Sequence, residues 1–162
     1  MSEKKHLLSI LVDNEPGVLS RITGLFSGRG YNIESLSVAE TVDPKVSRIT
    51  MVTKGSPNII EQIQKQLNKL INVIKVTDLT GSNYVQREMA LIKVNAKTDH
   101  RAEILRITDI FRGQVVDVGM EHFTVKVTGD PDKIIAILNL FKPFGIREIA
   151  RTGNIALPRE SK

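Results

Sequence analysis

The apolar residues at the start of the chain have first the pattern of a strand and then the spacing of a helix. Residues 7–12 form a short apolar run typical of a strand, and the apolar positions after it recur at helical spacing: Val18, Leu19, Ile22, Leu25 and Phe26. A hairpin around Asp43 and Pro44 is then predicted between two strands, which are marked by Ile33, Leu36, Val38, Ile49 and Met51. A second helix carries Ile59, Ile60, Ile63, Leu67 and Leu70, and residues 73–76 form a last strand.

The same order of elements returns after a polar, turn-forming stretch, Thr80-Gly81-Ser82-Asn83. The two halves also share residues, because Phe26-Ser27-Gly28 aligns with Phe111-Arg112-Gly113 in an internal repeat of about 85 residues. Each half reads β-α-β-β-α-β, the split β-α-β arrangement of ferredoxin-like domains. We therefore predict an α+β fold with two ferredoxin-like domains, at residues 1–80 and 85–162, with a linker at 81–84.

The stretch from Asp13 to Leu19 joins the first strand to the first helix and predicts an anion site. Pro16 suits a first helical turn, because the N–H that it lacks would have no partner there. Gly17 removes a Cβ where a ligand approaches the backbone. The free N–H groups of that turn and the positive end of the helix dipole favour a carboxylate or a phosphate.

The residues alone allow two interpretations of this site. Asn14 and Glu15 also suit plain helix capping. Asn32 starts the second strand, which we expect beside the first, so that its amide faces a ligand at the first helix; an Asn after a helix stop equally suits a turn. In the second half, Thr98-Asp99-His100-Arg101-Ala102 can cap a helix but lacks the glycine, so only the first domain is expected to keep the site.

Composition narrows the function classes. The chain has no cysteine, which excludes disulfides and thiolate chemistry and fits a cytoplasmic protein. The net charge of +5 allows nucleic-acid binding, but the basic residues are scattered and only 4% of residues are aromatic, which argues against it. No stretch approaches the length of a membrane span. The three histidines fall on separate predicted elements, so we expect neither a catalytic site nor a metal site.

Two stretches, DNEPGVLSR at residues 13–21 and GLFSGRGYNIESL at 24–36, closely resemble the regulatory small subunit of acetohydroxyacid synthase, also called acetolactate synthase. The resemblance continues through five further segments, at residues 47–50, 66–70, 87–88, 111–114 and 150–153. Members of that family join an N-terminal ACT domain, of the split β-α-β type, to a C-terminal domain of related architecture. The tail at residues 157–160 departs from the family pattern, and we assign it no function.

The resemblance implies a non-catalytic subunit that binds the catalytic large subunit, raises its activity and makes it sensitive to valine. Thiamin diphosphate, Mg²⁺ and FAD are expected in the large subunit, with no cofactor in this chain. In the family, valine or another branched-chain amino acid lies between the ACT domains of a homodimer. The corresponding residues here are Asn14, Pro16, Gly17, Val18 and Leu19 of one chain, with Asn32 and Ile33 of the other.

Two rival functions use the same loop, and a third, an enzyme, does not. A stand-alone amino-acid sensor has the same loop with a different partner. A ligand-gated transcription regulator needs a separate DNA-binding segment, for which the two domains leave no room. An enzyme in its own right lacks an evident catalytic constellation.

Overall fold

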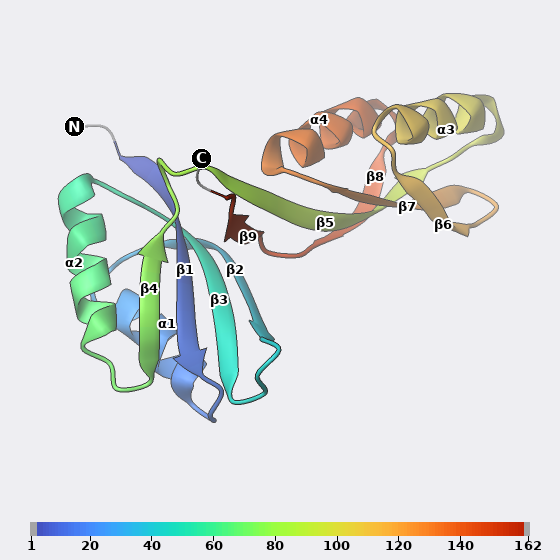
Figure 1. The fold of residues 1–162 in the computed structure, drawn as a ribbon. Coiled ribbons are helices and arrows are strands. Elements are labelled where there is room, and N and C mark those ends of the chain that lie inside the picture. Colours follow the sequence, from blue (N-terminus) through green and yellow to red (C-terminus); the bar gives the residue numbers. More distant parts are fainter. Residues whose placement is uncertain (1–2, 161–162) are drawn as a thin grey trace. The chain divides into compact units, whose positions relative to one another are not determined.

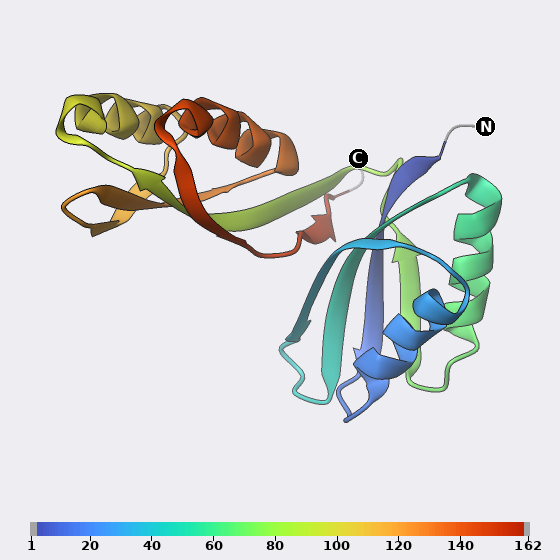
Figure 2. The same cartoon turned by 180° about the vertical axis from the view of Figure 1, so that it is seen from behind.

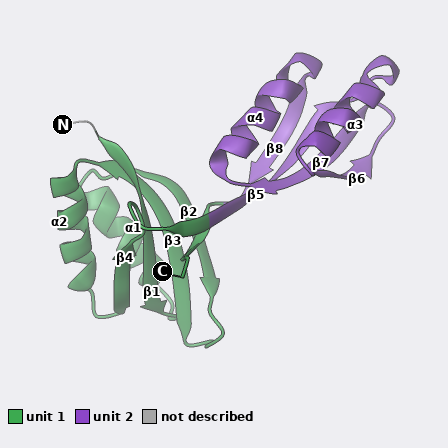
Figure 3. Ribbon diagram, turned by 45° about the horizontal axis from the view of Figure 1, so that its top comes forward, with its two compact units in different colours: residues 1–85, 153–162 green, residues 86–152 purple. Residues whose placement is uncertain are grey.

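The computed structural model describes residues 3–160, and the chain divides into two compact units (Figure 3). One unit comprises residues 1–85 with 153–162, and the other comprises residues 86–152. The predicted boundaries were 1–80, 81–84 and 85–162. The structure differs at the C-terminus, where residues 153–162 group with the first unit.

The first unit is built on a four-stranded sheet with two helices on one face (Figures 1 and 2). Its elements are β1 (Lys4–Asp13), α1 (Val18–Gly28), β2 (Ile33–Glu40), β3 (Val46–Gly55), α2 (Pro57–Asn68) and β4 (Val73–Asp78). The strand order across the sheet is β2-β3-β1-β4, and each neighbouring pair is antiparallel. The predicted β-α-β-β-α-β order is confirmed here.

The core of the first unit lies between the sheet and its helices. Alternate residues of β1 face this core, as the period of a strand requires, and each helix adds one buried stripe. The buried residues are Leu8, Ile10 and Val12 on β1, Val18, Ile22 and Phe26 on α1, and Ile60, Ile63 and Leu67 on α2. Each large apolar side chain contributes about 1.5–3 kcal/mol on burial. Packing therefore holds α1 in place although Gly24 lowers its intrinsic helix propensity.

The second unit repeats this plan. Its elements are β5 (Tyr84–Asn95), which begins in the first unit, a short 3₁₀ turn (Thr98–His100), α3 (Arg101–Ile110), β6 (Gln114–Val118), β7 (His122–Gly129), α4 (Pro131–Phe141), a second 3₁₀ turn (Lys142–Phe144) and β8 (Ile146–Arg151). The strand order β6-β7-β5-β8 mirrors that of the first sheet. The prediction of two ferredoxin-like domains is thus confirmed.

The second helix of each unit begins at a matching turn. Ser56 precedes Pro57, and its hydroxyl accepts a hydrogen bond from the N–H of Ile59 at 3.4 Å. Asp130 precedes Pro131 in α4, and its carboxylate accepts from the N–H of Lys133 at 2.9 Å. These caps satisfy N–H groups that have no partner within the helix.

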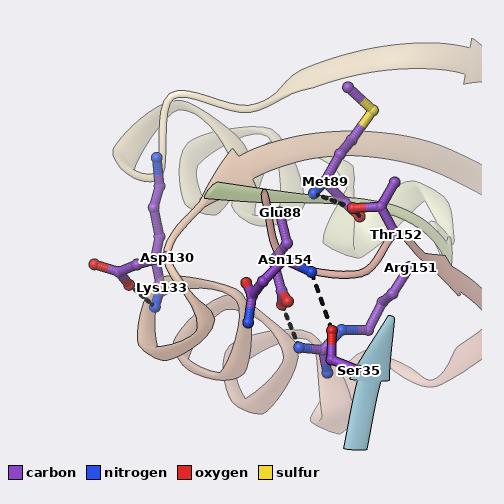
Figure 4. A network of polar contacts seen from close by, with 8 residues as sticks. All are labelled: Ser35, Glu88, Met89, Asp130, Lys133, Arg151, Thr152 and Asn154. Atoms are coloured by element: carbon purple, nitrogen blue, oxygen red, sulfur yellow. Dashed lines mark hydrogen bonds and ion pairs between the residues drawn. The ribbon is translucent and has the colours of Figure 1, made fainter. Parts of the chain in front are cut away.

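A further strand, β9 (Ile155–Pro158), was not predicted from the sequence, and it pairs with β5. Its Ala156 is 5% exposed and shares a small apolar cluster with Leu7, Val52 and Leu79 of the first unit. Just before it, the N–H of Asn154 donates to the hydroxyl of Ser35 on β2 at 3.1 Å (Figure 4). These contacts explain why the C-terminal residues group with the first unit.

Polar contacts also tie β5 to the end of β8 in the second unit (Figure 4). Arg151 donates to the buried carboxylate of Glu88, and the N–H of Met89 donates to the hydroxyl of Thr152 at 2.9 Å. A buried carboxylate requires such a partner, because an unpaired charge is costly to desolvate. None of the helices within residues 3–160 is long and apolar enough to cross a membrane.

Candidate functional site

The loop between β1 and α1 contains a tight turn that positions the start of the helix. The N–H of Val18 points back to the carbonyl oxygen of Glu15 at 3.4 Å, and Gly17 has φ 85° and ψ −8°. These angles fit the third position of a type II turn, which favours glycine there and proline before it. Pro16 therefore lies in the turn and not in the first helical turn that the sequence predicted, since α1 begins at Val18.

The N-terminus of α1 has no side-chain cap in the structure. Gly17 is the N-cap residue, and the first helical hydrogen bond runs from the N–H of Arg21 to its carbonyl oxygen. The N–H groups of Leu19 and Ser20 consequently have no acceptor within the helix. A Cβ built on Gly17 would meet no atom within 4 Å, so the backbone is open on that side. The alternative that Asn14 or Glu15 caps α1 is not what the structure shows.

Asn14 is held by the hairpin between β2 and β3. Its backbone N–H donates to the carbonyl oxygen of Lys45 at 2.8 Å. Its side-chain nitrogen donates to the carbonyl oxygen of Pro44 at 2.9 Å and to the carboxylate of Glu40 at 3.2 Å. A ligand that uses this nitrogen must therefore compete with the hairpin.

The two apolar residues of the predicted loop site differ in exposure. The side chain of Val18 belongs to the core and the residue is 4% exposed, whereas Leu19 is 41% exposed. Leu19 therefore presents the larger apolar surface beside the open N–H groups.

Asn32 and Ile33 are positioned by the way α1 ends. Gly30 has φ 71°, its N–H bonds to Ser27, and the N–H of Tyr31 bonds to the carbonyl oxygen of Phe26 at 2.9 Å. This is a Schellman motif, and the Tyr31 and Phe26 rings also meet edge to face. The motif turns the chain directly into β2.

The prediction that β2 lies beside β1 is wrong, because β3 lies between them. Asp13 pairs with Val46 near one end of β3, and Ile33 pairs with Thr53 near the other. These positions are seven residues apart (53 − 46), which corresponds to about 24 Å at ~3.4 Å per residue. Within one chain, the structure therefore does not bring Asn32 and Ile33 to the loop at residues 14–19. The prediction erred because it placed the two parallel strands of the split β-α-β unit side by side, whereas β3 is inserted between them.

The corresponding loop of the second unit is built differently. Thr98–His100 forms a 3₁₀ turn that leads into α3, and the N-cap residue His100 has φ −110°. The expected capping side chain is absent from α3, within the described part of the chain. Arg101 instead donates to the carbonyl oxygens of Ala96 and Gly119 at 3.0 Å each. A helix that begins after a glycine N-cap residue is thus found at α1 of the first unit and not at α3 of the second.

Each histidine makes its contact within its own unit. His6 contacts Asp78 at 2.9 Å, His122 contacts Asp117 at 3.3 Å, and His100 packs edge to face on Phe144. Among residues 3–160, no group of three or more His, Asp or Glu residues is arranged to hold a metal ion.

One part of the loop environment escaped the sequence analysis. Asn72, in the turn before β4, contacts Asp13, Glu15 and Arg21. An Asn between a helix and a strand is typical of a turn residue, so the sequence carries no signal for this role.

Comparison with known proteins identifies the class and then the family. Residues 8–75 match the family model described as the AHAS small subunit-like ACT domain, so the first unit is an ACT-type regulatory domain. Residues 87–160 match the model described as the small subunit of acetolactate synthase. The chain belongs to the family of acetolactate synthase small subunits.

Relatives match over nearly the full chain. An acetolactate synthase small subunit of Aquifex aeolicus is 53% identical over 158 residues, which cover 97% of this chain and 82% of the relative. A probable acetolactate synthase small subunit of Archaeoglobus fulgidus is 49% identical, with 98% of this chain and 99% of the relative covered. The crystal structure of a small subunit from Thermotoga maritima superposes with a TM-score of 0.91 at 42% identity and covers 98% of this chain and 99% of that one.

Proposed function

We propose that this chain activates the catalytic large subunit of acetolactate synthase and makes it sensitive to valine. The amino acid binds between the first units of two copies of the chain, at the loop of residues 14–19 from one copy and at Asn32 and Ile33 of the other. The chain itself is non-catalytic. Thiamin diphosphate, Mg²⁺ and FAD belong to the large subunit in this proposal.

The observation that carries the proposal is the position of the two half-sites at opposite ends of one sheet. β1 and β2 are both antiparallel to β3 and therefore parallel to each other. A twofold axis perpendicular to the strands reverses their direction, so it brings the loop end of one copy to the Asn32 end of another. β2 is also an edge strand, whose unpaired backbone groups favour pairing with a second chain. Homodimerisation thus accounts for a shared site that one chain cannot form.

The energies suit a metabolite sensor. The dipole of α1 contributes about 0.3–1 kcal/mol to binding a carboxylate. Hydrogen bonds from N–H groups to the charged carboxylate add about 1.5–3 kcal/mol each. Burial of the ligand side chain against Leu19 and Ile33 adds about 1.5–3 kcal/mol. After the entropy lost on association, these terms support micromolar to millimolar affinity.

Inhibition from such a site must be allosteric. A ligand on the small subunit does not occupy the active site of its partner, so valine acts through a coupling free energy between two states of the complex. A ligand held by two chains favours one placement of those chains, and the large subunits bound to them respond to that placement.

The proposal predicts complementation between two inactive variants. Gly17→Asp places a carboxylate where the ligand carboxylate binds, and Asn32→His alters the facing residue, so neither homodimer should bind valine. A heterodimer of the two variants keeps one loop and one Asn32 intact, and these belong to the same shared site. Purified from co-expression with two tags, it should bind valine at half of its sites in isothermal titration calorimetry.

A second heterodimer serves as the control. One copy carries both substitutions and the other copy is unmodified, so each shared site contains one altered residue and no valine should bind. A site formed within a single chain would give the opposite pair of results: no binding by the complementing heterodimer and half-site binding by the control. That reversal would contradict the shared site.

A further inference from the structure

Asn72 is buried although it is polar, and the residue before it is exposed although it is apolar. Asn72 is 9% exposed and Ile71 is 96% exposed. This reverses the usual preference of the two residue types. Burial of an amide is costly unless its donors and acceptors are satisfied, so the contacts of Asn72 must account for its position.

These contacts join three elements of the first unit. The backbone oxygen of Asn72 accepts from the N–H of Asp13 at 2.9 Å, and its Oδ1 accepts from Nη1 of Arg21 on α1 at 2.5 Å. Its Nδ2 donates long hydrogen bonds of 3.4 Å to the carboxylates of Asp13 and Glu15. The amide oxygen thus faces a cation and the amide nitrogen faces two anions, which is the favourable orientation of its dipole.

Glu15 is the nearest internal competitor for the anion site. It lies two positions before Gly17, the N-cap residue of α1, and carboxylates close to a helix N-terminus are stabilised there. In the structure, no side chain caps α1, and the Glu15 carboxylate lies at Asn72. The N–H groups at the helix start therefore stay open while Glu15 is held elsewhere.

We infer that Asn72, together with Arg21, is a positioning residue for the amino-acid site. It holds the Glu15 carboxylate at the turn before β4, and so keeps this carboxylate from occupying the N-terminus of α1 in place of the ligand. The inference rests on the proposed function, because the ligand that competes with Glu15 is the carboxylate of the bound amino acid.

Asn72→Asp tests the inference with almost no change in side-chain size. The new carboxylate still accepts from Arg21, but it replaces the amide donor with an oxygen that repels Glu15. Glu15 is then released to cap α1, and the Kd for L-valine, measured by calorimetry on the full-length chain, should rise about tenfold, the scale of a helix cap. Adding Glu15→Gln removes the competing charge and should restore the Kd to within about twofold of the unmodified value.

Rescue by Glu15→Gln distinguishes positioning from loss of stability. Ile63→Val, in the core of α2, serves as a destabilised control, and it should lower the Tm without changing the Kd. Arg21→Gln, on an exposed position of α1, should weaken valine binding about threefold, and it carries the test if Asn72→Asp fails to fold.

Two results would contradict the positioning role of Asn72 and leave the proposed function standing. One is an unchanged Kd in Asn72→Asp, and the other is a raised Kd that Glu15→Gln does not restore. Absence of valine binding by the unmodified chain would instead contradict the proposed function, and this inference with it.

Discussion

Gly17 shows how far a single residue could be interpreted from sequence. The sequence indicated a missing Cβ beside an anion site, and the structure adds a second requirement, because φ is 85°. A non-glycine residue in this region costs about 1–2 kcal/mol. Other residue-level features had no sequence signal: the hairpin contacts of Asn14 and the burial of Asn72 depend on segments distant in the chain.

Replacing Gly17 by Asn or by Asp separates backbone strain from charge. Both side chains have nearly the same size and both tolerate positive φ better than most residues, so stability should fall by a similar amount, about 1 kcal/mol. Only Asp adds a negative charge beside the proposed position of the ligand carboxylate. We therefore expect Gly17→Asn to retain weakened valine inhibition and Gly17→Asp to abolish it, while stimulation of the large subunit survives in both. Equal inhibition by valine in the two variants would exclude the charge effect and this position of the ligand carboxylate.

At the scale of elements, the repeated β-α-β-β-α-β order could be predicted because its signals are local. Strand alternation, helical stripes and turns containing Gly and Pro each lie within a few residues. β9 could not be predicted, because it is short and has one buried residue, Ala156, whose partners Leu7, Val52 and Leu79 are remote in sequence. The wrong adjacency of β1 and β2 has a different cause, since the split β-α-β arrangement that the sequence predicts already places another strand between its two parallel strands.

The two Pro-led helices allow a matched test of capping in the two units. Asp130→Ala removes a 2.9 Å hydrogen bond and should cost about 1–2 kcal/mol of unfolding free energy. Ser56→Ala removes a longer bond of 3.4 Å and should cost about 0.5–1 kcal/mol. Urea denaturation followed by circular dichroism measures both.

Asp132→Ala, in the first turn of α4, is the charge control for Asp130→Ala. It removes the same charge from an exposed position that makes no cap, so its cost should stay near the dipole value of about 0.3–1 kcal/mol. A loss equal to that of Asp130→Ala would mean that charge, and not the cap hydrogen bond, stabilises this helix start.

At the scale of the whole molecule, the proposed function depends on where the fold places the two parts of the proposed site. The loop of residues 14–19 and the pair Asn32 and Ile33 are separated by the length of β3 in one chain. In the proposed shared site, ligand binding depends on how two chains are placed, and we propose that this dependence lets a small metabolite act on a large partner. The sequence indicated these residues through family resemblance, whereas the proposal that two chains share the site rests on the strand order.

The most direct test of this account is the rate of acetolactate formation by the matching large subunit, with and without this chain, across a titration of L-valine. The account predicts that the chain stimulates the reaction in the absence of valine and that the stimulated rate falls as valine rises. A rate that the chain leaves unchanged at every valine concentration, together with failure of the two proteins to co-elute, would contradict it.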